Sequence, residues 1–380
     1  MIKFDIHTES SNSNARLGTF EINGKKIETP FLWIGSFLLQ KPKPWEFFPI
    51  DGIFLNAYEL IEKHKEDNFF QNGETVRSLI GNDKIFLMDS GGFQLLKKDI
   101  KMEPEKVLDI YHKAKPDIGV VLDFPLHPSS LNKRKQRWKQ TLKNTEFMIQ
   151  NSRDIALMPV IHGYSIKEIK KACQEVKQIS DPQIIGMGSL VPILRSLKTS
   201  NLPKLNDNSN SFKLLIKMIS TIREEFPDSF LHAFGVGSAS TMHLVFALGV
   251  DSVDSMSWRM KAAYGAIQLP GLSDRFVITK NRRKGRIPLT EFSLLDRCKC
   301  PICQNCASIE EKISMYSNST NNTFKKRAIH NAFILKEEEK NFKSYLKKDR
   351  LSYFFKIRAK KNKSYSNFNN YLTEHSNLYP

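Results

Sequence analysis

The sequence predicts an α/β protein built as a (β/α)₈ TIM barrel, with a structural zinc-binding subdomain toward its C-terminus. Two observations predict the barrel: eight short apolar runs alternate with helical stretches, and polar or acidic residues follow most of the runs. A third observation, four cysteines within nine residues, predicts the metal site. The apolar runs are Phe31–Ile34, Ile53–Leu55, Ile85–Met88, Ile118–Leu122, Ile155–Ile161, Ile184–Met187, Phe230–Phe234 and Ser252–Val253.

Carboxylates follow three of these runs. Asp89, Asp123 and Asp254 each come at a strand end, and the active site of a (β/α)₈ barrel lies at the C-terminal ends of its strands. A single aspartate at such a place often only caps a helix. Three at one rim, beside glycine-rich turns, favour a catalytic site. The other polar residues at strand ends are Asn56, Ser90–Gly91–Gly92, His162–Gly163, Gly188–Ser189 and Gly235–Val236–Gly237.

The chain divides into four segments by pattern. Residues 1–30 predict an antiparallel lead-in around the turn Asn23–Gly24, and residues 31–290 predict the barrel. Residues 291–340 hold the zinc subdomain, and residues 341–380 form a basic tail. No apolar stretch reaches about 18 residues, and the N-terminus lacks the pattern of a secretory signal. We therefore expect a cytoplasmic protein that does not bind a membrane.

The formal net charge of +18 and a pI near 9.5 favour a polyanionic partner, most commonly a nucleic acid. A lysine- and asparagine-rich proteome would raise the pI without any ligand. Three basic clusters support the first interpretation, because cations contact phosphates and aromatic rings stack on bases. The clusters are Lys133, Arg134, Lys135, Arg137 and Lys139 around Trp138; Lys280–Arg286; and Phe342–Lys363, which includes Tyr345, Tyr353, Phe354 and Phe355.

Three cysteines on one tight turn, Cys298, Cys300 and Cys303, predict a zinc site. Structural zinc takes four protein ligands, and either Cys306 or His330 can supply the fourth. We favour His330, because a histidine from a following helix would join the cysteine loop to the barrel. Four protein ligands leave no open position, so this Zn²⁺ is expected to be structural.

Paired carboxylates suit the cleavage of a glycosidic bond. One attacks the anomeric carbon and forms a covalent intermediate, while the other transfers protons. A third carboxylate can accept hydrogen bonds from the N–H edge of a purine. Together with a nucleic-acid partner, these residues predict an enzyme that takes a base out of the stack.

With these motifs the chain resembles the tRNA-guanine transglycosylase family. The resemblance covers roughly residues 15–335 and is most specific in the DSGGFQ motif and the cysteine motif. The matching pieces are Asp89–Gln94, the strand ending in Asp123, Gly188–Leu190, Gly235–Gly237, the GVDSVDS stretch around Asp254, Cys298, Cys300, Cys303 and His330–Asn331.

The resemblance implies an irregular TIM barrel that exchanges a base without cleaving the strand. Asp254 would be the nucleophile on C1′, Asp89 the general acid and base, and Asp123 the residue that holds the base. Zinc would sit on Cys298, Cys300, Cys303 and His330. The expected substrate-binding residues are Asp123, Ser90, Gly91, Gly92, Phe93, Gln94, Asn56, His162, Gly163, Gly188, Ser189, Leu190, Gly235, Gly237 and Arg259.

Two departures from the family pattern concern the substrate. His162 stands where bacterial enzymes of the queuosine pathway carry glutamine, and Met256–Arg259 replaces a Pro-Thr-Arg stretch that contacts the anticodon loop. GSLVPIL and HAFGVGS resemble instead the archaeosine enzymes and their DNA-modifying relatives. The closest likeness in character is the DNA 7-deazaguanine transglycosylase branch, which inserts 7-cyano-7-deazaguanine (preQ0) in place of guanine.

We therefore expect a pentosyltransferase that replaces guanine in DNA with preQ0, with exchange in tRNA as the alternative. In DNA-modification systems of this kind an ATPase partner can assist, and family likeness suggests a homodimer. A third interpretation is a non-catalytic nucleic-acid-binding subunit. The presence of Asp89, Asp123 and Asp254 together argues against it, because a binding subunit needs no nucleophile.

Overall fold

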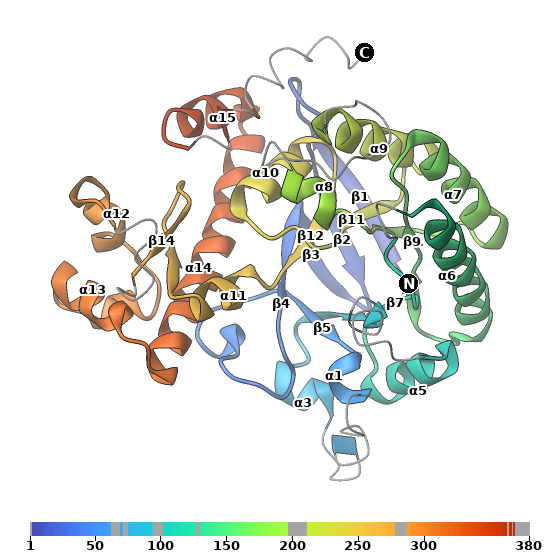
Figure 1. The fold of residues 1–380 in the computed structure, drawn as a ribbon, viewed down its shortest axis with the longest axis horizontal. Coiled ribbons are helices and arrows are strands. Elements are labelled where there is room, and N and C mark those ends of the chain that lie inside the picture. Colours follow the sequence, from blue (N-terminus) through green and yellow to red (C-terminus); the bar gives the residue numbers. More distant parts are fainter. Residues whose placement is uncertain are drawn as a thin grey trace.

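A parallel sheet that curls into a nearly closed barrel forms the centre of the molecule (Figure 1). The computed structural model describes residues 2–61, 69–70, 75–92, 94, 102–126, 130–196, 211–277, 287–362, 365, 366 and 368. Within these residues the sheet has nine strands in the order β8-β7-β6-β5-β4-β12-β11-β10-β9. Their bounds are β4 (Phe31–Gly35), β5 (Gly52–Asn56), β6 (Ile85–Asp89), β7 (Ile118–Val120), β8 (Ala156–Met158), β9 (Val160–Ile161), β10 (Ile184–Met187), β11 (Phe230–Ala233) and β12 (Ser252–Ser255).

The barrel confirms the predicted fold class, with one difference in the fifth strand. The run Ile155–Ile161 forms two strands, β8 and β9, because Pro159 lies between them and has no N–H to donate to a ladder. β8 pairs with β7 and β9 pairs with β10, so this single run supplies both edges of the sheet. The seam of the barrel therefore lies at Pro159.

Helices surround the sheet; most bury one face, whereas α10 is buried at every position. In α7 the buried residues Ile169, Ala172, Cys173 and Val176 recur at intervals of three and four, which is the period of an amphipathic helix. Serine caps begin α6, α7 and α10. The helix bounds are α1 (Tyr58–Ile61), α3 (Val76–Ile80), α5 (Pro104–Ala114), α6 (Leu131–Asn151), α7 (Ile166–Ile179), α8 (Val191–Ser196), α9 (Ser211–Glu225), α10 (Ala239–Ala247) and α11 (Ser257–Ala263).

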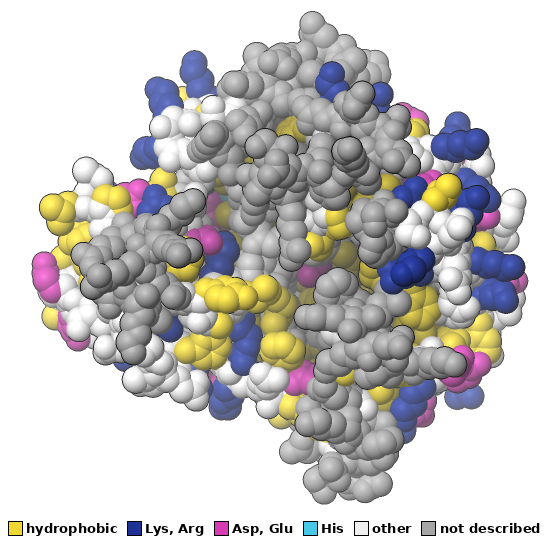
Figure 2. Space-filling view, in the orientation of Figure 1, with side chains coloured by type: hydrophobic (Ala, Val, Ile, Leu, Met, Phe, Trp, Pro, Cys, Tyr) yellow, Lys and Arg dark blue, Asp and Glu magenta, His cyan; other side chains and the backbone are white. Residues whose placement is uncertain are grey.

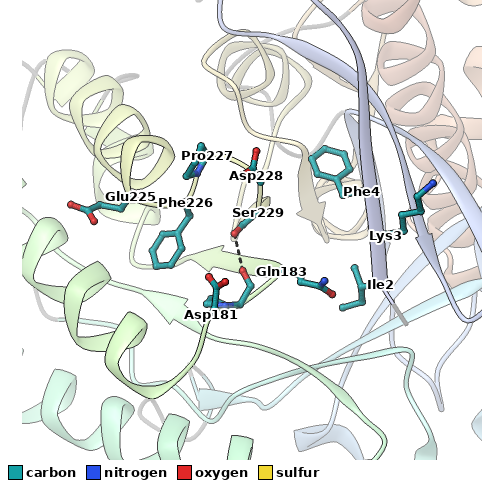
Figure 3. A pocket seen from close by; sticks show the side chains of 11 residues that line it. Ile2, Lys3, Phe4, Asp181, Gln183, Glu225, Phe226, Pro227, Asp228 and Ser229 are labelled. Atoms are coloured by element: carbon teal, nitrogen blue, oxygen red, sulfur yellow. Dashed lines mark hydrogen bonds between the residues drawn. The ribbon is translucent and has the colours of Figure 1, made fainter.

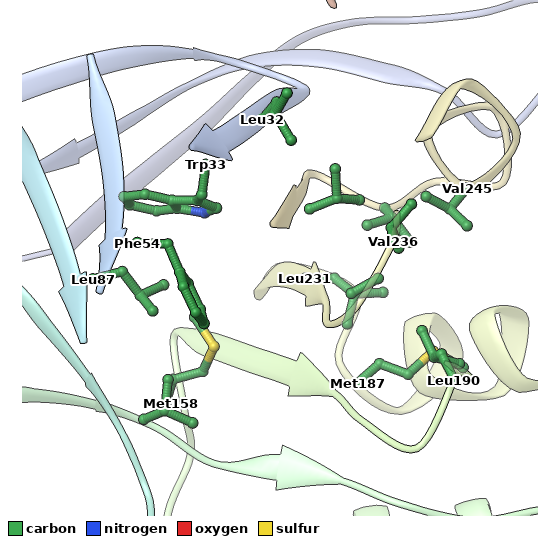
Figure 4. Close-up of a cluster of buried hydrophobic side chains, with 14 of the residues drawn as sticks. Leu32, Trp33, Phe54, Leu87, Met158, Met187, Leu190, Leu231, Val236 and Val245 are labelled. Atoms are coloured by element: carbon green, nitrogen blue, oxygen red, sulfur yellow. The ribbon is translucent and has the colours of Figure 1, made fainter. Parts of the chain in front are cut away.

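Large apolar side chains fill the inside of the barrel (Figure 4). Trp33, Phe54, Leu87 and Met158 come from four different strands and point toward one another. All four are buried. The interior is thus a packed core, which leaves the strand ends as the place for a site.

A three-stranded antiparallel sheet covers the N-terminal end of the barrel. It consists of β1 (Ile2–Glu9), β2 (Arg16–Ile22) and β3 (Lys25–Thr29) in that order. The rings of Phe4 and Phe20 pack against Phe230, the first residue of β11, with centroids 5.4 and 4.4 Å away. The aromatic contacts thus fix this sheet to the start of β11.

The C-terminal part packs beside the barrel around one long helix. This helix, α14 (Asn321–Leu346), reaches from the cysteine cluster to the start of β4, where Glu339 Oε2 accepts the N–H of Leu32 at 3.0 Å. The other elements of this part are β13 (Ala266–Gln268), β14 (Asp274–Phe276), α12 (Phe292–Asp296), α13 (Ile309–Ser317), α15 (Leu351–Ala359) and the short 3₁₀ turns Leu289–Glu291 and Cys303–Asn305. Another 3₁₀ turn, Pro44–Glu46, lies between β4 and β5.

The expectation that aromatic residues of the basic tail stack on bases is wrong for several of them. Phe342, Phe354 and Phe355 are buried, and Phe342 and Phe354 pack against the ring of His243. Tyr353 is exposed. The cluster Lys280–Arg286 lies outside the described residues. In the part of the chain that the structure describes, no helix has the length and apolar character needed to cross a membrane.

Candidate active site and metal centre

Asp89 is the last residue of β6, and Asn56 is the last residue of the neighbouring strand β5. The two residues pair in register, so Asn56 Nδ2 donates to Asp89 Oδ2 over 2.7 Å. The pKa of Asp89 is raised to about 8, chiefly by burial and further by the nearby carboxylates of Asp123 and Asp254. Asp89 therefore holds a proton at neutral pH.

The DSGGFQ turn follows Asp89 directly. The N–H of Gly91 donates to Asp89 Oδ2 at 3.1 Å. Gly92 lies so close to the carbonyl oxygen of Asp123 that a Cβ there would be 1.8 Å from it, so only glycine fits. Ser90 Oγ and Gln94 Oε1 are buried and have no hydrogen-bond partner among the described residues. These two atoms remain available to a ligand. Phe93 lies outside the described residues.

Asp123 comes after β7, which ends at Val120 rather than at the predicted Leu122. Side chains of α6 hold this segment, since Asn144 Nδ2 donates to Leu122 O and Thr141 Oγ1 accepts the N–H of Phe124, both at 2.9 Å. The segment thus extends past the strand without sheet pairing, and α6 fixes where Asp123 lies.

His162 lies between Asp123 and the turn after β10. Its Nε2 is 3.0 Å from Asp123 Oδ2, and its Nδ1 is 2.8 Å from Ser189 Oγ. Ser189 Oγ also accepts the N–H of Leu126 at 2.8 Å. The structure thus joins three predicted substrate-binding residues to one another. Their neighbours in the same turns are Gly163, Gly188 and Leu190.

Asp254 lies within β12, one position before its last residue. Its Oδ1 accepts the N–H of Gly235 at 2.9 Å. Gly235 has φ of +74°, a conformation that glycine adopts readily, and this turns its N–H toward the carboxylate. Gly237 follows in the same loop, and a Cβ there would lie 4.0 Å from Ser257 Cβ.

His232 is a neighbour of Asp254 that was not among the predicted site residues. It lies within β11, and its Nε2 is 3.5 Å from Asp254 Oδ1. The available signal was a lone histidine inside the apolar run Phe230–Phe234, directly before the Gly235 turn. A histidine in such a run is more often part of the core, so the residue types alone did not mark it.

The three carboxylates have different environments. Asp89 is protonated, whereas Asp123 and Asp254 each face a histidine nitrogen. A protonated carboxyl group can act as the general acid while a neighbouring carboxyl group acts as the nucleophile. We call Asp89, Asp123 and Asp254 the three-carboxylate site.

Arg259, another of the predicted substrate-binding residues, contacts the loop after β4. Its guanidinium lies between the rings of Phe37 and Phe324, at 5.3 and 5.2 Å from their centroids. It donates to Lys41 O at 2.8 Å and to Gln40 Oε1 at 3.1 Å. These contacts hold the loop after β4 against the rest of the protein.

Two hollows open on the described surface. One, of about 340 Å³, is lined by Phe124, the residue after Asp123, and by Lys133, Gln136, Arg137 and Gln140; we call it the α6 groove. The other, of about 350 Å³, lies between β1 and the loops that precede β10 and β11 (Figure 3). Because those loops lead into the strands, this second hollow is at the opposite end of the barrel from the carboxylates.

The predicted zinc ligands meet in one buried cluster. The ligand atoms of Cys298, Cys300, Cys303 and His330 all lie within 4.8 Å of one another. His330 Nδ1 is 3.7, 3.4 and 3.6 Å from the three sulfur atoms in that order. A tetrahedral Zn²⁺ with ordinary bond lengths separates nitrogen and sulfur ligands by about 3.6 Å. The spacing therefore fits zinc.

The surroundings of the cluster also suit a metal. His330 Nε2 lies 2.9 Å from Gln268 O, so it carries the proton and leaves the Nδ1 lone pair facing the cysteines. Tyr316 Oη lies 3.1 Å from Cys303 Sγ. Cys306, the alternative ligand, points to Ile302 O and Met315 Sδ and is not in the cluster. The preference for His330 over Cys306 agrees with this arrangement.

Comparison with known proteins places the chain in a family. The family model described as queuine tRNA-ribosyltransferase matches residues 10–364. The chain is 26% identical over 384 aligned residues to the tRNA-guanine(15) transglycosylase of Pyrococcus abyssi, covering 100% of this chain and 60% of the relative. It is 28% identical over 290 residues to the protein of the same name from Nanoarchaeum equitans, covering 73% and 66%.

The relatives are longer than this chain, which spans 60% of the Pyrococcus abyssi protein and 55% of the Pyrococcus furiosus protein, to which it is 26% identical over 358 residues. The match to the family model nevertheless runs through the barrel, the three-carboxylate site and the cysteine cluster. The chain belongs to the queuine tRNA-ribosyltransferase family, the tRNA-guanine transglycosylases.

Proposed function

We propose that this protein exchanges guanine in a nucleic acid for a free base through a covalent Asp254–glycosyl intermediate, and that tRNA is its polymer. The observation that carries the proposal is a protonated carboxyl group, Asp89, close to a second carboxyl group, Asp254, at the three-carboxylate site. Asp89 has a pKa raised to about 8, while Asp254 accepts the N–H of Gly235 and faces a histidine. One carboxyl group thus has a proton to give, and a second one beside it can act as the nucleophile.

The reaction runs in two displacements. The carboxylate of Asp254 attacks C1′, the C1′–N9 bond breaks, and the proton of Asp89 passes to the departing guanine. The incoming base then attacks C1′ with its N9, the C1′–O bond to Asp254 breaks, and Asp89 takes back a proton. Two inversions at C1′ retain the configuration of the sugar.

Polar atoms around the site suit a purine. Asp123 can accept N–H groups from the base, and His162 orients its carboxylate. Ser90 Oγ and Gln94 Oε1 are buried atoms without partners among the described residues, and Gly188–Leu190 follow the end of β10. A base that fills the site would satisfy the polar atoms that the protein leaves unpaired.

The names of the relatives favour tRNA over the DNA that we first expected. Three relatives at 26–28% identity are called tRNA-guanine(15) transglycosylases. A tRNA substrate is also consistent with a cytoplasmic location. Exchange of preQ0 into DNA is the second candidate, since Arg259 is bound to Gln40 and Lys41 rather than held out for an anticodon loop. The ATPase partner goes with the DNA candidate. The homodimer is proposed from family likeness alone.

The α6 groove is the proposed path for the polymer. Lys133 and Arg137 lie one helical turn apart on its wall, and Arg137 Nη1 is anchored on Pro125 O at 2.9 Å. Phe124, the residue after Asp123, supplies an aromatic surface. Figure 2 shows lysine and arginine side chains over α6 and α7 at the right of this face. Cations beside a ring suit a phosphate next to a base.

Zn²⁺ is the proposed occupant of the cysteine cluster, held by Cys298, Cys300, Cys303 and His330. With four protein ligands it would supply no open position for chemistry and would act as a structural clamp. His330 lies on α14, which also contacts β4, so the metal would tie the cysteine turn to the barrel.

The experiment incubates the purified protein with radiolabelled guanine and offers bulk tRNA and duplex DNA separately. Asp254→Asn serves as the inactive variant. Asp181→Asn, an exposed carboxylate at the opposite end of the barrel, is the matched control. Label is expected in tRNA with the native protein and the control, and not with Asp254→Asn. Label in DNA alone would replace tRNA with the second candidate, and label in neither polymer would contradict the exchange activity.

A further inference from the structure

His232 is a buried histidine beside the proposed nucleophile, and one of its ring nitrogens has no hydrogen-bond partner among the described residues. The side chain is 0% exposed. Its Nε2 points to Asp254 Oδ1 at 3.5 Å. The rings of Phe54 and Phe234 pack on it, with centroids 6.4 and 4.4 Å away. Aromatic rings thus enclose this side chain.

The position of the proton on this ring follows from a chain of three side chains. Trp33 Nε1, which can only donate, gives its hydrogen to Ser252 Oγ at 3.2 Å. Ser252 Oγ lies 2.8 Å from Nδ1 of His232, the residue that it pairs with in register across β11 and β12, and it can donate its own hydroxyl hydrogen to that nitrogen. With Nδ1 as acceptor, a neutral ring carries its hydrogen on Nε2, facing Asp254.

Both donors near Asp254 approach the same oxygen. The N–H of Gly235 lies 2.9 Å from Oδ1, and His232 Nε2 is also nearest to Oδ1. None of the described residues makes a hydrogen bond or an ion pair with Asp254 Oδ2. The two oxygens of the carboxylate are therefore distinct before any substrate binds.

We propose that His232 is a positioning residue that holds Asp254 by Oδ1, so that Oδ2 is the oxygen that attacks C1′. The inference rests on the proposed function, since it takes Asp254 as the nucleophile. In the covalent intermediate Oδ1 is the ester carbonyl oxygen. When the second base attacks, the C1′–Oδ2 bond breaks and its electron pair returns to the carboxylate. The N–H groups of Gly235 and His232 stabilise that returning charge, and so speed the breakdown of the intermediate.

The same arrangement recurs at the carboxylate that is proposed to hold the base. There the N–H of Leu126 donates to Ser189 Oγ, Ser189 contacts His162 Nδ1, and His162 Nε2 faces Asp123. Asp89, the carboxyl group that keeps its proton, receives an amide and a backbone N–H instead. A histidine that contacts a serine thus lies beside each of two carboxylates, the proposed nucleophile Asp254 and the proposed base-binding residue Asp123.

Two substitutions separate hydrogen bonding from packing. His232→Gln can keep an N–H near the place of Nε2, whereas His232→Leu fills the space without a donor. In single-turnover experiments the breakdown of the covalent adduct is expected to slow about 10-fold to 100-fold in His232→Leu. His232→Gln should restore most of the rate, and the KM for the polymer should change little in either variant. Equal losses in the two variants would show a packing role and overturn the proposal.

A second measurement does not depend on activity. In protein labelled with ¹³C and ¹⁵N at histidine, the NMR spectrum is expected to show His232 as the neutral Nε2–H tautomer at pH 7, with His232→Gln providing the assignment. Ser252→Ala should admit the other tautomer. An Nδ1–H or doubly protonated ring would overturn the inference even if guanine exchange proceeds. Failure of exchange in both polymers, with the tautomer as expected, would count against the proposed function instead and would leave no step for His232 to assist.

Discussion

Asn56 and Asp89 end neighbouring parallel strands in register, and the amide of Asn56 donates to Asp89 over 2.7 Å. The hydrogen bond goes to a carboxyl group whose pKa is raised to about 8, chiefly by burial. An amide donor stabilises the ionised form of a carboxyl group and orients it. Asn56 therefore moderates the rise in the pKa of Asp89 and aims the group, so that Asp89 can both release and recover a proton near neutral pH.

The first prediction concerns pH. Asp89 is protonated below about pH 8 and loses its proton above it, so the release of guanine should slow as the pH rises through that value. Single-turnover release measured from pH 6 to pH 10 checks this. In Asn56→Ala the ionised form loses one hydrogen bond, so the midpoint should move upward by about half a unit to one unit. A midpoint that stays fixed or falls would contradict the role given to Asn56.

The second prediction concerns the metal. The native protein should contain about one zinc per chain by elemental analysis, and His330→Ala should lose it together with thermal stability. Cys306→Ala is the matched control, because Cys306 lies outside the cluster. The control should keep both its metal and its melting temperature. Loss of zinc from Cys306→Ala would show that the ligand set is wrong.

The third prediction concerns the α6 groove. Replacing Lys133 and Arg137 together by alanine should raise the KM for the polymer about 10-fold at low salt and leave the KM for guanine unchanged. The slope of binding against salt should decrease by about 2, one unit for each lost phosphate contact. The control replaces Lys167 and Lys170, exposed on α7, and removes the same charge. Equal effects in both variants would indicate only a general charge effect.

The fourth prediction concerns the C-terminal helices. Phe354 is 0% exposed and packs on His243 and Phe342, whereas its neighbour Tyr353 is 55% exposed. Phe354→Ala should therefore lower the free energy of unfolding by about 3–5 kcal/mol. Tyr353→Ala should change it by no more than about 0.5 kcal/mol. Denaturant unfolding of the two variants checks this, and similar small losses in both would mean that α15 does not belong to the core.

The strand-end pattern predicted much of the site because a (β/α)₈ barrel brings the ends of distant strands together. Asn56 and Asp89 lie at the last positions of their strands, and Asp123 and Asp254 lie at the same end of the barrel. The cysteine spacing predicted the metal cluster for a similar local reason, since three of its ligands lie on one turn.

Other features depend on tertiary contacts that a linear pattern does not contain. The division of Ile155–Ile161 at Pro159 depends on which strands each half meets around the barrel. His232 becomes part of the site only because Ser252 and Trp33, from two other strands, orient its ring. Arg259 packs between the rings of Phe37 and Phe324, from two distant parts of the chain. Phe354 and Phe355 sit among basic residues in sequence but pack inward.

The most direct test of the account is to find the covalent intermediate. The protein is incubated with tRNA in the absence of free base, quenched in denaturant, digested with nuclease and protease, and analysed by mass spectrometry. A ribosyl adduct is expected on the peptide that contains Asp254, and it should disappear in Asp254→Asn and on addition of guanine to the native protein. An adduct on Asp89 or Asp123, or exchange of guanine in tRNA with no adduct at Asp254, would contradict the assignment of Asp254 as the nucleophile.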